Sequence, residues 1–62
     1  MKAIVTNKID PRIKVEYKAF NVSVHTYHDE QVGYDGSPMW VIETAVGTAS
    51  FKCSDWNINI EE

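Results

Sequence analysis

Hydrophobic and polar residues alternate with a period of two along most of this chain. The alternation is cleanest in residues 12–18, where Ile13, Val15 and Tyr17 point to one side of an extended chain. The positions between them are charged, namely Arg12, Lys14, Glu16 and Lys18. Successive side chains of a strand leave opposite faces, so this segment predicts a strand with one buried face and one wet face.

A second alternating run follows at once, but its phase is shifted by one residue. Its apolar side consists of Phe20, Val22 and Val24, with Thr26 in the same phase. An uncorrected slip of one residue would send this apolar set to solvent. We therefore expect a bulge or a turn near residues 19–21 that absorbs the extra residue.

The rest of the chain divides at its glycines and prolines. We predict a strand at residues 3–6, a loop at 7–11, a loop at 31–38, strands at 39–45 and 48–53 joined by a turn at 46–47, one helical turn at 54–56, and a last strand to residue 61. The second loop holds two of the three glycines and one of the two prolines. The turn includes Gly47, which takes a positive φ without steric cost, so the flanking strands form a hairpin.

Five or six short strands without a covering helix need another way to bury one face of a sheet. Curling the sheet into a barrel buries that face and removes exposed edges. A long loop, a tight hairpin and one helical turn before a short last strand are the layout of an SH3-like barrel. We therefore predict an all-β fold, a single domain over residues 1–62 that forms a small five- to six-stranded antiparallel barrel. An OB-like barrel and an open sheet closed by dimerisation fit the same pattern.

Composition narrows the setting of the protein. Hydrophobic residues make up 44% of the 62 positions, which is too high a fraction for a disordered chain. Cys53 is the only cysteine, so no disulfide forms within the chain and a reducing compartment is expected. There is no signal peptide pattern and no apolar run of the roughly 20 residues that a membrane span needs. We expect a cytoplasmic protein without a membrane partner.

The stretch SVHTYHDE, residues 23–30, gathers both histidines with two carboxylates and raises the question of a metal site. On a regular strand, His25 and His28 are an odd number of positions apart and point to opposite sides. His25 and Asp29 share a side, but four residues of strand separate their α-carbons by roughly 13 Å. Ligands of one zinc ion must each lie about 2 Å from it. We therefore expect no metal and no other cofactor, and interpret the stretch as the polar end of a strand.

No other residues form a recognisable catalytic set. Cys53 is in phase with Ala49 and Phe51, which predicts a small core residue and not a nucleophile. Gly33 and Gly36 precede no helix, so they do not match a phosphate-binding loop. We expect no catalytic residues and no enzyme activity.

The remaining hypothesis is a protein that acts through its surface. Residues 29–62 hold seven acidic residues against one lysine, and tyrosine, tryptophan and methionine near the second loop are types enriched at interfaces. We predict a small stand-alone protein-binding module, a modulator or inhibitor of a larger host protein, of viral or mobile-element origin and able to form a homo-oligomer. Its expected contact residues are Asp29, Glu30, Tyr34, Asp35 and Met39. For Trp40 a place in the core is favoured over exposure.

The alternative is a small barrel that binds nucleic acid. Its candidate surface consists of Lys8, Arg12, Lys14 and Lys18. Glu16 interrupts this surface and no aromatic residue lies between the basic ones, whereas phosphate-binding domains are usually strongly basic. The net charge of -3 therefore ranks protein binding first.

Overall fold

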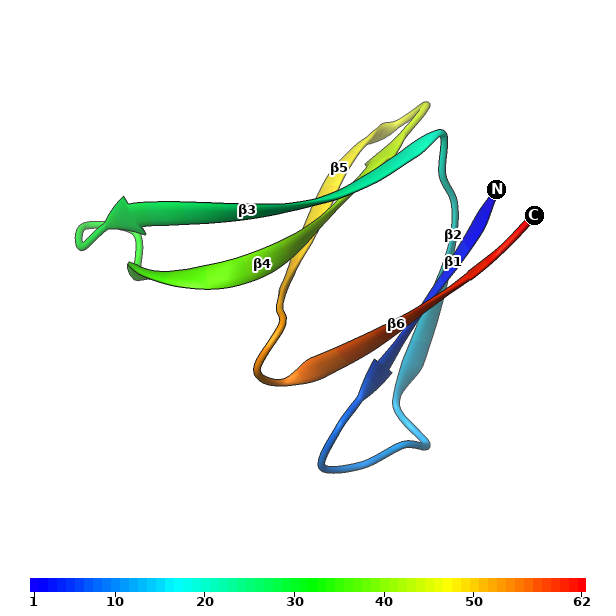
Figure 1. Ribbon diagram of the computed structural model, residues 1–62, viewed down its shortest axis with the longest axis horizontal. Helices are drawn as coiled ribbons and strands as arrows, with labels where there is room; N and C mark the ends of the chain where they lie inside the picture. Colours follow the sequence, from blue (N-terminus) through cyan, green and yellow to red (C-terminus); the bar gives the residue numbers. More distant parts are fainter.

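The computed structural model describes residues 1–62 and contains only strands and the turns between them. The strands are β1 (Lys2–Asn7), β2 (Lys14–Lys18), β3 (Asn21–Asp29), β4 (Tyr34–Thr44), β5 (Gly47–Lys52) and β6 (Trp56–Glu61). They form two three-stranded antiparallel sheets, with spatial orders β2-β1-β6 and β3-β4-β5 (Figure 1). The predicted all-β, antiparallel class is confirmed. The structure holds no helix that could serve as a membrane span.

β1 is the central strand of the first sheet, and its alternation decides what that sheet buries. Ala3 and Val5 are fully buried, and the register sets them beside Tyr17 and Val15 of β2. Tyr17 packs against the core, as its phase predicts. Val15 is 36% exposed, because β2 lies at the edge of the sheet and the second sheet does not cover its far end.

The shift of phase after β2 occurs where the sequence places it. β2 ends at Lys18 and β3 begins at Asn21, so Ala19 and Phe20 form the corner between the sheets. The Ala19 amide donates to the Met1 carbonyl and the Phe20 amide donates to the Glu43 carbonyl, at 2.9 and 3.0 Å. At this corner the chain passes from one sheet to the other. This is why the core-facing residues are odd-numbered in β2 and even-numbered in β3.

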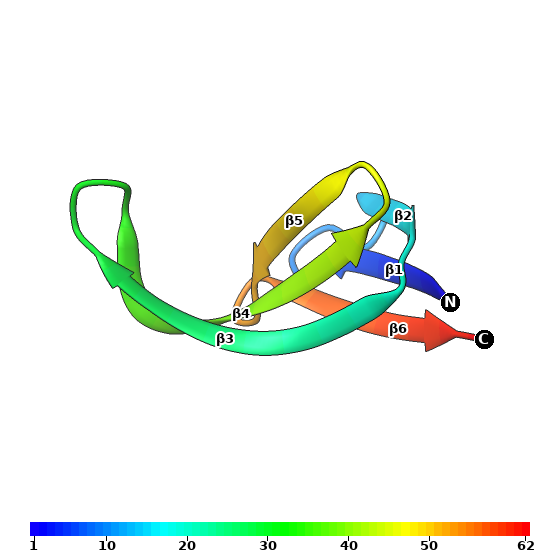
Figure 2. The same ribbon diagram turned by 90° about the horizontal axis from the view of Figure 1, so that it is seen from above.

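β3 and β4 are the longest strands, and both extend beyond the end of β5. β5 pairs with β4 only from Met39 to Thr44, whereas β3 pairs with β4 from Glu43 out to Tyr34. Residues 26–38 therefore form a two-stranded hairpin that projects from the body of the molecule (Figures 1 and 2). We call these residues the arm.

The arm contradicts the predicted loop at residues 31–38. Only residues 30–33 form a turn, and β4 already begins at Tyr34. Gly36, with φ of 86°, and Pro38 are tolerated inside β4 because β5 does not pair with that part of the strand. Proline and glycine that break a central strand are acceptable where one side of the strand has no neighbour.

The predicted helical turn at 54–56 is also wrong. The chain turns one residue earlier, at 53–55, where the Asp55 amide donates to the Lys52 carbonyl at 3.1 Å, and Trp56 is already part of β6. The other hairpin turns at Ala45 and Val46, so Gly47, at φ of 141°, is the first residue of β5.

The core lies between the two sheets and is small. Ala3, Val5, Ala19 and Ile42 form its buried centre. Half-buried residues surround them, namely Tyr17, Val22, Ala49, Phe51, Trp56 and Ile58. Trp40 is half-buried as well, and its indole Nε1 donates to the Trp56 carbonyl at 3.0 Å. This hydrogen bond ties the second sheet to the start of β6.

Candidate functional site

A β-bulge shapes the arm. The register between β3 and β4 shifts between Thr26 and His28, where Gly36 and Ser37 of β4 lie opposite Tyr27 alone, so the extra residue is on β4. A bulge bends its strand and strengthens the twist, and it serves to aim a side chain. At the tip, a carboxylate oxygen of Asp29 accepts from the Gln31 amide at 3.1 Å, which closes the turn. The arm is thus a defined hairpin and not a loop.

An aromatic row crosses the arm from one strand to the other. The rings of His25 and Tyr27 are stacked, with centroids 5.9 Å apart and planes at 20°. Tyr27 also contacts Tyr34 of β4, with centroids 5.6 Å apart and planes at 42°. The His25 imidazole Nε2 lies 2.9 Å from the Ser23 hydroxyl, which fixes the ring at the base of the row.

This aromatic row (His25, Tyr27 and Tyr34) is open to solvent. Tyr27, its middle member, is 42% exposed. No third strand pairs with β4 before Met39, and the arm projects from the two sheets (Figure 1). Aromatic side chains with polar ends are effective in binding surfaces because they offer large contact areas at a small cost in side-chain entropy.

The charge of the arm is exclusively acidic at neutral pH. Asp29, Glu30 and Asp35 are exposed, and residues 19–51 contain no lysine or arginine. Hydrogen bonding from Ser37, first its side chain and then its backbone amide, lowers the pKa of Asp35 from its ordinary value. The Ser37 amide lies 3.0 Å from a carboxylate oxygen of Asp35. The arm therefore presents negative charge beside the aromatic row.

Four of the five predicted contact residues lie on the arm. Asp29, Glu30 and Asp35 are exposed, and Tyr34 is half-buried against Tyr27. Met39 is separate from them. It is only 7% exposed, because the register places it in the middle of a sheet between β3 and β5, so its side chain is not available to a partner.

His25 and Tyr27 are the residues of the aromatic row that the sequence analysis did not assign to the contact surface. Both were interpreted as part of a polar strand end, and Tyr34 was placed in a loop with no fixed partner. The signal that links them is the hairpin itself, because cross-strand pairing brings residues 27 and 34 together around a four-residue turn. The strand predicted from the sequence begins at residue 39, and with that boundary residues 27 and 34 are not expected to meet.

The histidines do not share one environment. His25 lies in the aromatic row, whereas His28 is paired with Asp35 across the hairpin. The His28 ring lies beside Gly36, where an added Cβ would meet its Cδ2 atom at 3.5 Å. The structure brings no three histidine, cysteine or carboxylate side chains together in a group that could hold a metal ion.

The basic residues of the nucleic-acid alternative lie on β2 of the other sheet and in the loop between β1 and β2. Arg12 is engaged by Asp10 through two hydrogen bonds, of 2.9 and 3.0 Å. This pairing raises the pKa of Arg12 and lowers the pKa of Asp10. Lys14 and Lys18 flank Glu16 on β2, and all three side chains are exposed.

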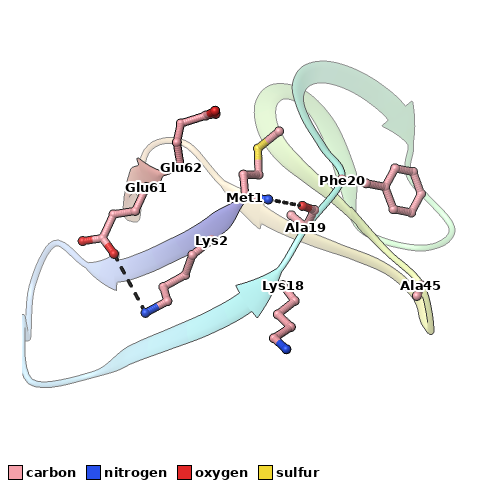
Figure 3. A pocket seen from close by; sticks show the side chains of 8 residues that line it. All are labelled: Met1, Lys2, Lys18, Ala19, Phe20, Ala45, Glu61 and Glu62. Atoms are coloured by element: carbon pink, nitrogen blue, oxygen red, sulfur yellow. Dashed lines mark hydrogen bonds and ion pairs between the residues drawn. The ribbon is translucent and has the colours of Figure 1, made fainter.

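A hollow on the surface lies at the opposite end of the second sheet from the arm tip. It has a volume of about 600 Å³ and is open to solvent; its lining residues are Met1, Lys2, Lys18, Ala19, Phe20, Ala45, Glu61 and Glu62 (Figure 3). Two interactions cross it, a bond from the terminal amine of Met1 to the Ala19 carbonyl at 3.0 Å and an ion pair of Lys2 with Glu61 at 3.9 Å. Lys2 and Glu61 point toward each other, whereas Lys18 and Glu62 point away from them (Figure 3).

No family model matches this chain, and neither a curated protein nor a solved structure is similar to it.

Proposed function

We propose that this protein is a small protein-binding module that modulates or inhibits a larger host protein, and that the arm is its contact surface. The observation that supports this proposal is the aromatic row with its neighbouring carboxylates on a hairpin that no other strand covers. The arm buries none of the four core residues, so its length and its exposed aromatic residues contribute little to the fold. A surface of this kind is typical of a recognition element.

The partner is expected to bury Tyr27 between complementary side chains. Truncation of a buried tyrosine at the centre of an interface commonly costs about 2 kcal/mol or more in binding free energy. The carboxylates at the rim contribute less to affinity, and they increase the association rate with a basic partner. We therefore expect the interaction to weaken more on loss of the Tyr27 ring than on loss of Glu30.

The test is a comparison of three tagged proteins in capture experiments from host lysate. Wild type recovers a stoichiometric partner, and Tyr27→Ala loses it. Ile9→Ala is the matched control, because Ile9 is 89% exposed and lies in the loop between β1 and β2, away from the arm. Equal recovery of the partner by wild type and Tyr27→Ala would refute the arm as the contact surface. Recovery of no stoichiometric partner by wild type would refute the proposed function.

The nucleic-acid alternative has weaker support. The Arg12 guanidinium is already paired with Asp10, and Glu16 lies between Lys14 and Lys18 on β2. Binding to random-sequence DNA that falls steeply with salt would favour it over the protein-binding proposal.

Two finer proposals accompany the function. We propose that the two sheets are an open form of an SH3-like barrel, supported by the corner at Ala19 and Phe20 and the short turn before β6. We also propose a cytoplasmic setting, supported by the single cysteine, which is half-buried and unpaired.

A further inference from the structure

Two sheets of three strands have four edges, and the strands at three of these edges are shorter or more charged than the fourth. β2 carries Lys14, Glu16 and Lys18 among its five residues. β5 and β6 are six residues long and end in Lys52 and Glu61. Charged side chains and short length are the devices by which natural proteins keep sheet edges from associating.

β3 is the exception. It is nine residues long, and its first eight residues, Asn21 to His28, include no lysine, arginine, aspartate, glutamate or proline. It lies at the edge of its sheet, with β4 on one side and no strand on the other. Its regular part, residues 21–26 before the bulge, therefore presents unpaired backbone donors and acceptors to solvent.

The opposite edge of the arm shows that this openness is specific to β3. There, β4 extends beyond β5 with Asp35, Gly36 and Pro38. A charge, a residue at φ of 86° and a residue without an amide hydrogen block strand addition on that side. Thus β4 has a blocked edge within the arm, whereas β3 has an open edge over residues 21–26.

A strand at the edge of a sheet has a neighbour on one side only, so its side chains are covered less than those of a central strand. Val24, in the middle of the regular part of β3, is 52% exposed although it belongs to the apolar parity of its sheet. A strand added beside β3 would cover it.

We propose that this strand is β3 of a second copy of the chain, paired antiparallel about a two-fold axis to give a continuous six-stranded sheet. The uncharged run makes the strand compatible with itself, because no like charges come to face one another. With the axis at Val24, the two Val24 side chains cover each other. This isologous contact closes at two copies.

The experiment is sedimentation equilibrium of the full chain at concentrations from about 5 to about 500 µM, where contacts of modest area dissociate. Wild type is expected to convert from monomer to dimer within that range. Val24→Lys places two lysines opposite each other and uncovers the valine contact, so its dissociation constant rises about tenfold or more. Val46→Lys is the matched control, because Val46 is 98% exposed in the turn between β4 and β5, and it dimerises like wild type.

A second variant guards against misfolding of the first. Thr26→Lys changes an exposed residue of the same edge that lies outside the core, and it also weakens the dimer. Circular dichroism confirms that each variant retains its strands. The proposal is overturned if the wild type stays monomeric at every concentration or assembles beyond two copies. It is also overturned if Val24→Lys and Thr26→Lys dimerise as well as the wild type. Because these readouts use purified protein alone, they are independent of the partner-capture test of the proposed function.

Discussion

Truncation of Ile42 to alanine removes the largest side chain that is fully buried in this protein. Ile42 has no exposed surface and lies on β4 with Ala3, Val5 and Ala19 around it. Such truncations lower the free energy of unfolding by about 2–5 kcal/mol, because apolar contacts are lost and a cavity remains. Two of its three core neighbours are alanines, whose side chains are too short to fill the space. We therefore expect a loss in the middle of the range, about 3–4 kcal/mol.

This loss is large relative to the total free energy of unfolding of the protein. At about 0.05–0.15 kcal/mol per residue, a chain of 62 residues has a total stability of about 3–9 kcal/mol. Urea unfolding followed by tryptophan fluorescence measures the change, because Trp40 and Trp56 are hydrogen-bonded to each other next to the core. Ile42→Ala is expected to be partly unfolded without denaturant, or to unfold at a much lower urea concentration than wild type.

Two control variants separate burial from chemistry. Ile42→Val removes one methylene and lowers the free energy of unfolding by about 1 kcal/mol. Val46→Ala shortens a side chain that is 98% exposed and changes stability by no more than about 0.5 kcal/mol. A loss below about 1 kcal/mol for Ile42→Ala would show that Ile42 is not at the centre of a packed core.

Two further predictions concern hydrogen bonds. Trp40→Phe removes the indole donor to the Trp56 carbonyl, so the free energy of unfolding falls by roughly 1–2 kcal/mol in the same urea assay; an unchanged midpoint would contradict that bond. Hydrogen bonding from Arg12 lowers the pKa of Asp10 below the ordinary value of 3.8. The chemical shift of the Asp10 carboxyl carbon, followed by NMR as a function of pH, measures this pKa, and Arg12→Met is expected to raise it. Because the folded pKa is the lower one, this pairing stabilises the fold above the unfolded pKa and is lost as the pH falls through the folded value. The difference in the free energy of unfolding between wild type and Asp10→Asn is therefore expected to disappear at acidic pH. A difference that persists at acidic pH would refute the pairing.

The residue alternation predicted most strands because it depends only on neighbouring positions. The two-residue period at Ile13, Val15 and Tyr17 is a property of any extended chain, and the shift of phase after Lys18 requires a corner in any sheet. The hairpin of β4 and β5 follows from the same local pattern, although its turn lies at Ala45 and Val46 and not at residues 46–47 as predicted.

The prediction failed at Gly36 and Pro38, and the reason is not local. Both residues break a central strand, so residues 31–38 were interpreted as a loop. They are tolerated because β5 is too short to reach them, and the length of β5 relative to β4 is decided by how the hairpins pair. The aromatic row was missed for the same reason, since Tyr27 and Tyr34 meet only when the arm is a hairpin.

The sequence by itself determined most of the strands, the parity of their side chains and the acidic character of residues 29–62, because these properties follow from neighbouring residues. The tertiary structure alone decided which apolar side chains are covered. Met39 is buried between two neighbouring strands, whereas Val24, of equally apolar character, is 52% exposed at an edge. Burial depends on how many neighbours a strand acquires, and that number is a property of the assembled sheets.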